Sequence, residues 1–144
     1  RGRGEQVEAL DAAARARLTG RRVLVCKPGF GIATAWAYRQ IAAQPAAYVS
    51  AAAAEAHVAG WRADAAAAVE ALLANNLETV VFAKHLALPT LLAQLRAHGV
   101  APRMSGSGSA CYALLADGVD AAPLVAAVRA AWGGDCFAVV TTLA

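Results

Sequence analysis

The residues with the clearest chemical potential lie between Met104 and Ala110, where the chain reads SGSGS from Ser105 to Ser109. Glycines such as Gly106 let the backbone adopt positive φ and come close to a ligand. Successive amide groups in such a turn can point inward as a nest for an anion, and serine hydroxyls add further donors. A tight turn without any ligand favours the same residue types. The segment matches neither GxxxxGK[ST] nor GxGxxG before a helix, so both interpretations stay open.

A flexible tether between two domains is a third interpretation of a glycine-serine run. The residues after Ser109 supply two predicted strands and one predicted helix, which are too few to fold independently. We therefore expect the run to lie inside one domain, where it connects residues 100–104 to the strand that follows.

Other residue types with catalytic potential are dispersed along the chain. His57, His85 and His98 lie far apart, and histidines on helix surfaces or at helix ends are more often solvated than used as bases or ligands. Ser109 and Cys111 lack the GxSxG elbow that would favour a nucleophile. The three cysteines also lack CxxC spacing. We therefore expect free, buried thiols in a reducing cytoplasm, and no metal site.

Composition narrows the class of protein. The chain has 144 residues, which suits one domain with a core of its own. Its net charge of +3 comes from scattered basic residues, whereas nucleic-acid binding favours a dense basic stripe. Much of the 59% hydrophobic content is alanine, and no uncharged apolar run reaches the roughly 18 residues of a membrane helix. No signal peptide opens the chain. We therefore expect a soluble, cytoplasmic protein with neither membrane nor nucleic-acid partners.

The elements that must position the glycine-serine run follow from periodicity and turn residues. Short apolar runs predict strands at residues 22–26, 110–116 and 136–143. Helical patterns predict one helix at residues 34–43, with Thr34 as its N-cap, and another at residues 63–74. Residues 45–60 are alanine-rich and leave helix and loop equally open.

Several residues have the types and positions of helix boundaries. Asn75 and Glu78 have the spacing of a capping box. The helical pattern after them breaks at Pro89, which suits the first turn of a new helix, and Gly99 is expected to end it. Asp120 is expected to cap a last helix that a glycine pair, residues 133–134, stops.

The predicted order is strand, several helices, strand, helix, strand. The simplest fold for this order is an α+β, two-layer, ferredoxin-like sandwich, with helices on one face of a small, mainly antiparallel sheet. We expect residues 21–144 to form this domain. Residues 1–20 would be the tail of a preceding domain or a connecting strand.

Residues 104–115, MSGSGSACYALL, resemble the third signature motif of the GHMP kinases, a glycine-rich turn close to the nucleotide phosphates. KPGFGIATAWAYR at residues 27–39, NNLE at residues 75–78 and residues 3–10 extend the resemblance. Their order and spacing are similar to those of the family members that phosphorylate 4-diphosphocytidyl-2-C-methyl-D-erythritol (CDP-methylerythritol). Because the sequence begins with Arg1 rather than methionine, we expect a piece of a longer protein, similar to the second of that family's two domains.

The resemblance implies an enzyme that passes the γ-phosphoryl group of ATP to the 2-hydroxyl of CDP-methylerythritol, in non-mevalonate isoprenoid precursor synthesis. It implies ATP and Mg²⁺ as cofactors. It also implies two sets of site residues: a nucleotide-phosphate loop of Ser105, Gly106, Ser107, Gly108 and Ser109, and a substrate pocket lined by Thr34 and Tyr38. The Tyr38 ring would stack on the cytosine, although from the residues alone it could equally belong to a helix core.

Some features of the family are absent or altered. Its phosphate-cradling loop, PxxxGxGxSSA, and its catalytic lysine and aspartate belong to the first domain, and nothing here matches them. We therefore expect no catalytic residue in this chain and no kinase activity from it alone. Asn76 stands where the family usually has aspartate, a change that a capping role would survive and a charge-dependent role would not.

Two alternatives remain at this point. One is a non-catalytic ferredoxin-like module for ligand sensing or interaction, in which the glycine turn is structural only. The other is the corresponding domain of another GHMP kinase, such as one that acts on homoserine or mevalonate.

Overall fold

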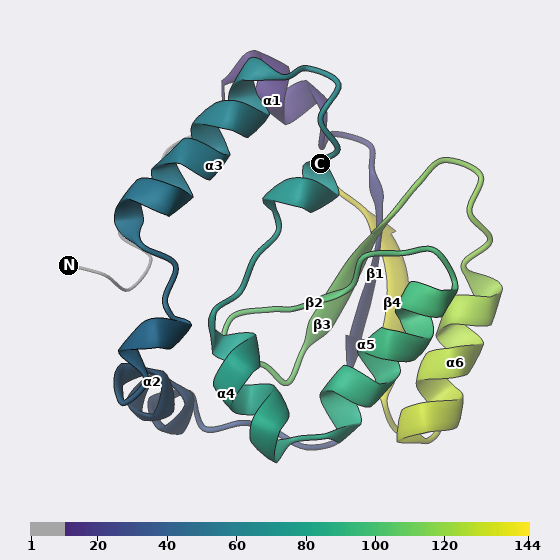
Figure 1. Ribbon diagram of the computed structural model, residues 1–144. Coiled ribbons are helices and arrows are strands. Elements are labelled where there is room, and N and C mark those ends of the chain that lie inside the picture. The colour runs from purple at the N-terminus through teal and green to yellow at the C-terminus, as the bar shows by residue number, and fades with distance from the viewer. Residues whose placement is uncertain (1–10) are drawn as a thin grey trace.

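The computed structural model describes residues 11–144, so the resemblance at residues 3–10 lies outside the described part (Figure 1). The described elements, in chain order, are α1 (Ala12–Ala16), β1 (Arg22–Lys27), α2 (Thr34–Ala42), the 3₁₀ turn η1 (Pro45–Ala47), α3 (Ala51–Ala63), the 3₁₀ turn η2 (Val69–Leu72), α4 (Leu77–Lys84), α5 (Ala87–Ala97), β2 (Arg103–Met104), β3 (Cys111–Leu115), α6 (Ala122–Trp132) and β4 (Phe137–Thr142).

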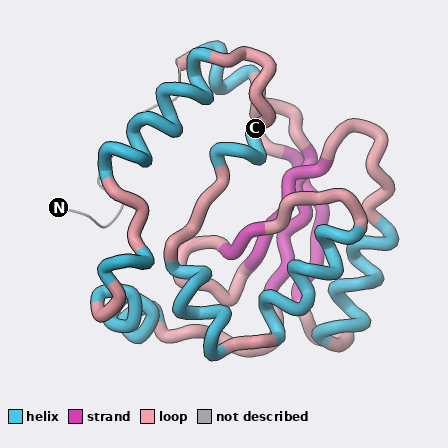
Figure 2. Tube along the Cα trace, in the orientation of Figure 1, coloured by secondary structure: helices cyan, strands magenta, loops and turns pink. Residues whose placement is uncertain are grey.

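The four strands form one antiparallel sheet in the order β2-β3-β1-β4. In its centre, Cys26 of β1 pairs with Cys111 of β3, and Val25 pairs with Val139 of β4. Figure 2 shows α4, α5 and α6 as a helical layer in front of the sheet. The predicted α+β, two-layer fold with a small antiparallel sheet is therefore confirmed, with the short strand β2 as an addition.

The main core lies between the helical layer and one face of the sheet. Leu24 of β1 and Ala113 and Leu115 of β3 point into it, because alternate residues of a strand share a face. Helix α5 contributes a stripe of fully buried leucines at i, i+3, i+4 and i+7 spacing: Leu88, Leu91, Leu92 and Leu95. Each buried leucine contributes about 2 kcal/mol through the area it removes from water.

A second, smaller core covers part of the other face of the sheet. Val23 of β1 and Leu114 of β3 meet Ala14 of α1, Trp61 of α3 and Val69 of η2 there. The helices therefore do not all lie on one face, since α1 and the end of α3 pack on the second. This arrangement follows from the strand alternation, which leaves apolar side chains on both faces of β1 and β3.

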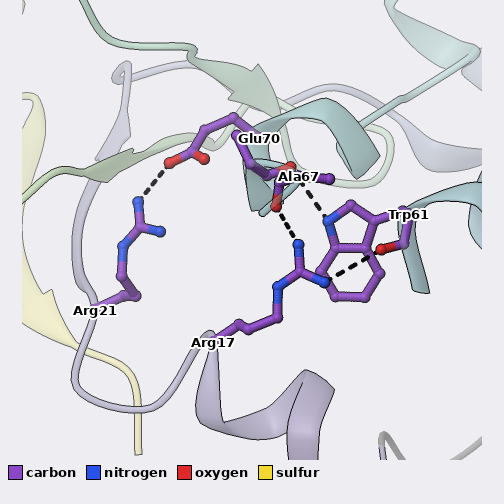
Figure 3. A network of polar contacts seen from close by, with 6 residues as sticks. Arg17, Arg21, Trp61, Ala67 and Glu70 are labelled. Atoms are coloured by element: carbon purple, nitrogen blue, oxygen red, sulfur yellow. Dashed lines mark hydrogen bonds and ion pairs between the residues drawn. The ribbon is translucent and has the colours of Figure 1, made fainter. Parts of the chain in front are cut away.

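Polar contacts around Arg17 reinforce the second core (Figure 3). The Arg17 guanidinium donates to the backbone carbonyls of Trp61, at 3.2 Å, and of Ala67. It also lies 3.8 Å from the centre of the Trp61 ring, as a cation–π contact. Arg21 forms an ion pair with Glu70 close by. These contacts tie the segment before β1 to the last turn of α3 and to the segment after it.

The helix predicted at residues 63–74 is wrong, because α3 ends at Ala63 and only the turn η2 follows. The Asp64 carboxylate accepts a hydrogen bond from the Ala66 amide at 2.9 Å, a local turn that competes with helix. The Ala67 carbonyl accepts from Arg17 instead of a helical amide. Tertiary contacts thus override the helical preference of alanine.

Residues 45–60, for which the sequence did not decide between helix and loop, contain the turn η1 and most of α3. The Ser50 hydroxyl caps α3 by accepting from the Ala53 amide at 3.2 Å. The N-cap prediction for Thr34 is wrong, since Thr34 is the first residue of α2 and Ala33 precedes it as N-cap. The predicted helix end at Gly99 is confirmed, with φ of +80°.

The remaining boundaries are close to the predicted ones. Pro89 lies in the first turn of α5. The Asp120 carboxylate accepts from the Ala122 amide at 2.9 Å, although Ala121 holds the N-cap position of α6. Gly133 ends α6 with φ of +84°. Within residues 11–144, no helix has both the length and the apolar character that crossing a bilayer requires.

Candidate functional site

The glycine-serine run forms a compact loop between β2 and β3, which we call the glycine loop, residues 105–109. The Ser105 amide donates to the Ala110 carbonyl at 2.8 Å, and the Gly108 amide donates to the Ser105 carbonyl at 2.9 Å. Gly106 and Gly108 have φ of +53° and +78°, a region that other residues rarely adopt. The run is therefore an ordered part of the domain and not a tether.

Gly108 is required for a second reason. A Cβ atom at this position would lie 2.7 Å from the Met104 sulfur and 3.1 Å from Cδ1 of Ile32. By contrast, a Cβ atom on Gly106 would meet nothing within 4 Å. The loop therefore packs tightly on one side and is open on the other.

Asn75 and Glu78 hold the glycine loop from the α4 side. The Asn75 side-chain amide donates to the carbonyls of Met104 and Gly106, at 2.8 Å each. The Glu78 carboxylate accepts from the Met104 amide, also at 2.8 Å. The predicted capping box is therefore wrong, because the Glu78 carboxylate accepts from Met104 of β2 and not from a backbone amide at the start of α4. Only the Asn75 oxygen acts locally, by accepting from the Leu77 amide at 3.0 Å.

The three serines of the glycine loop have different surroundings. Ser109 is only 1% exposed, and its hydroxyl donates to the Phe30 carbonyl. The Ser107 hydroxyl lies 2.9 Å from the Thr34 hydroxyl. Ser105 is exposed. The Ser109 side chain is therefore committed to the fold, while those of Ser105 and Ser107 face outward.

The backbone amides of Gly106 and Ser107 have no hydrogen-bond partner among the described residues. Both lie on the open side of the glycine loop, next to the outward hydroxyls. Consecutive unpaired amides with hydroxyls beside them suit the oxygens of an anion. This part of the loop can therefore donate hydrogen bonds to a phosphate oxygen, whereas the Ser105 and Gly108 amides already donate to the carbonyls of Ala110 and Ser105.

The two predicted substrate residues lie on α2. Thr34, at the first residue of α2, reaches the glycine loop through its contact with Ser107. Tyr38 lies one turn further along, half-buried, and packs against the main core. The structure thus brings Thr34 to the loop and gives Tyr38 a packing role at the same time.

Sequence reasoning missed an aromatic cluster beside the glycine loop. The His85 ring stacks on Phe30, with ring centres 5.7 Å apart, and meets Trp36 edge-on at 5.6 Å. The Lys84 ammonium lies 4.3 Å from the centre of the Trp36 ring. His85 is the C-cap residue of α4, a helix-end position as expected, and its ring is half-buried between these rings. The aromatic spacing in residues 27–39 was the available signal.

Two thiols lie beneath the glycine loop. Burial raises the pKa of Cys26 to about 12, and that of Cys111 to about 12 as well. The Cys111 thiol donates to the Ser109 carbonyl at 3.6 Å. All three cysteines are free, as predicted, and these two stay protonated at neutral pH. They are therefore packing groups and poor nucleophiles.

An open hollow of about 740 Å³ lies at the opposite end of β3 from the glycine loop. Its lining includes Arg21, Glu70, Arg96, Leu114 and Asp117. Positive and negative side chains are balanced there, and Arg21 is already paired with Glu70. Among the described residues, no group of three or more acidic, histidine or cysteine side chains could hold a metal ion.

Comparison with known proteins finds a matching family model and similar solved structures. The family model described as "GHMP kinases C terminal" matches residues 52–134. A solved structure titled "Crystal structure of 4-(cytidine 5'-diphospho)-2C-methyl-D-erythritol kinase" is similar with a TM-score of 0.66 and 28% sequence identity. That similarity covers 98% of this chain and 48% of the other, so this chain spans about half the length of that kinase. No curated protein shows a significant match.

Proposed function

The chain belongs to the GHMP kinase C-terminal family, and we propose that it forms the second domain of an ATP-dependent kinase whose acceptor is the 2-hydroxyl of CDP-methylerythritol. The observation that carries the choice of acceptor is the similarity to a CDP-methylerythritol kinase along 98% of this chain, at 28% identity. The domain comprises at least residues 21–144, and the described segment before it packs on it through Ala14 and Arg17. The kinase acts in the cytoplasm, in isoprenoid precursor synthesis.

The site geometry supports a role in bringing donor and acceptor together. Phosphoryl transfer depends mainly on positioning the two reactants and on stabilising charge on the phosphoryl oxygens. The unpaired amides of Gly106 and Ser107 would serve the phosphates of ATP, and Thr34 and Tyr38 would serve the cytidine. The contact between Thr34 and Ser107 makes these two sets of residues neighbours.

The two cofactors fit this chain unequally. The glycine loop offers hydrogen-bond donors, which suit phosphate oxygens. Residues 105–109 contain no carboxylate for Mg²⁺, which prefers oxygen ligands. In this proposal the glycine loop binds phosphate, while Mg²⁺ would be held by the phosphates themselves and by the first domain of the kinase.

Steady-state turnover of the full-length protein with MgATP tests the proposal, with CDP-methylerythritol, homoserine and mevalonate as acceptors. Of the three acceptors, we expect only CDP-methylerythritol to give ADP release. We expect no ADP release when the 144-residue chain is assayed without the rest of the protein. Turnover with homoserine or mevalonate instead would make the protein another GHMP kinase. No turnover with any acceptor and no ATP binding would leave a ligand-sensing module.

A further inference from the structure

Asn75 hydrogen-bonds the glycine loop and the residue before it. Its oxygen accepts from the Leu77 amide, so its nitrogen must face the opposite way. That nitrogen donates to two carbonyls, those of Met104 and Gly106, in segments 29 and 31 residues away. The side chain therefore has all its strong hydrogen-bonding groups engaged, and its orientation is fixed.

These contacts set the direction of the loop amides. In a trans peptide the carbonyl and the following amide point in opposite directions. Because the Met104 carbonyl faces Asn75, the Ser105 amide points away from it, and indeed meets the Ala110 carbonyl at 2.8 Å. By the same geometry, the Gly106 carbonyl on Asn75 directs the Ser107 amide away from α4. That amide has no partner among the described residues.

The surroundings of Asn75 support a directional role over a purely structural one. Gly106 has positive φ, and a Cβ atom there would meet nothing within 4 Å. The contact between Ser107 and Thr34 is made by the two hydroxyls and not by the peptide group. Glu78 fixes only the Met104 amide, on the strand side of the loop. Among the described residues, Asn75 is thus the side chain that hydrogen-bonds the Gly106–Ser107 peptide, through the Gly106 carbonyl.

We propose that Asn75 is a positioning residue for the nucleotide, which holds the Gly106–Ser107 peptide with its amide turned toward the phosphates. This inference rests on the proposed function and assigns a part of it to a residue outside the glycine loop. Asn75 touches no reacting atom. It acts through the peptide plane that it holds, without adding charge to the loop.

The variant Asn75→Asp tests this directly, because a carboxylate would repel the two carbonyls and favour the reversed peptide. In the full-length kinase we expect the KM for MgATP to rise about tenfold or more, while the KM for CDP-methylerythritol stays within about twofold. Asn76→Asp is the matched control, since it adds the same charge one residue away, at the N-cap position of α4, where a carboxylate is favourable.

A merely structural role would lower the melting temperature of Asn75→Asp and leave the ratio of the two KM values at that of the control, which would overturn the proposal. If Asn75→Asp does not fold, the same ratio of KM values is measured for Asn75→Ala, which removes the hydrogen-bond donor without adding a repulsive charge. A ratio equal to that of the control would again overturn the proposal. If the wild-type protein shows no turnover, the proposed function fails, and tripolyphosphate then tests the positioning role separately. Tripolyphosphate should shift the Ser107 amide resonance in the wild-type protein and less in Asn75→Asp, and equal shifts would contradict the role.

Discussion

Arg17 and Asn75 make the same kind of contact in two regions of the molecule, with opposite results for the backbone around them. Each side chain donates to two carbonyls of distant segments, Arg17 to Trp61 and Ala67, and Asn75 to Met104 and Gly106. The Arg17 contacts end in a closed region, where the guanidinium also covers the Trp61 ring. The Asn75 contacts end at a loop in which the Gly106 and Ser107 amides have no partner among the described residues.

The difference shows how one interaction serves stability in one place and binding in another. A charged donor strengthens the hydrogen bonds to carbonyls, which suits the junction around Arg17, where nothing further has to bind. A neutral carboxamide orients the glycine loop while leaving its electrostatic potential to the backbone amides. We therefore expect changes at Arg17 to act on stability, and changes around the glycine loop to act on nucleotide binding.

The largest effect is expected from Gly108→Ala, which changes the glycine loop, the binding region of this comparison. Positive φ costs a non-glycine residue about 1–2 kcal/mol, and the clash with Met104 and Ile32 adds about 1–3 kcal/mol. We expect a loss of about 3 kcal/mol in the free energy of unfolding, with MgATP binding lost as well. Gly106→Ala is the control, with about 1–2 kcal/mol from its φ alone. If urea denaturation gave equal losses in the free energy of unfolding for the two variants, the close packing of Gly108 against Met104 and Ile32 would be contradicted.

A smaller effect, on stability alone, is expected from Arg17→Ala. The variant leaves two carbonyls without their charged donor and removes the cation–π contact, for a total of about 2 kcal/mol. The KM for MgATP should not change, since Arg17 is remote from the glycine loop. Arg62, exposed on α3, provides the control variant Arg62→Ala, with little change in either quantity. A rise in the KM for MgATP with Arg17→Ala would contradict the separation of the two regions.

The strands and the glycine loop could be predicted from the sequence because their signals are local. Apolar runs bounded by glycine and proline mark β1 and β3, and the SGSGS run lies directly before β3. The roles of Asn75, Glu78 and Ser109 could not be predicted, since their partners lie at least 26 residues away in the chain. Local reasoning assigned the first two to a capping box for this reason.

The same limit explains the error at residues 63–74. Alanine favours helix when only neighbours are considered, but here the Ala67 carbonyl is taken by Arg17 from a segment 50 residues away. Thr34 shows the reverse case. Its position at the start of α2 was predictable, whereas its contact with Ser107 spans 73 residues and depends on the fold.

The smallest effect is expected from Glu70→Gln, which removes the ion pair with Arg21 in the region that we expect to affect stability alone. The Arg21 and Glu70 side chains are 23% and 25% exposed, and a partly exposed ion pair contributes up to about 1 kcal/mol. We expect a destabilisation of that size at low salt, measured by thermal unfolding, which shrinks as salt screens the pair. A loss that does not depend on salt would mean that packing, and not charge, is what Glu70 contributes.

Amide resonances of the full-length protein during titration with MgATP test the central claim most directly. We predict that the Gly106 and Ser107 amides shift most within residues 11–144, and that Ala67, beside Arg17, does not move. Shifts confined to the hollow at the far end of β3, around Arg96 and Asp117, with none in the glycine loop, would contradict the account.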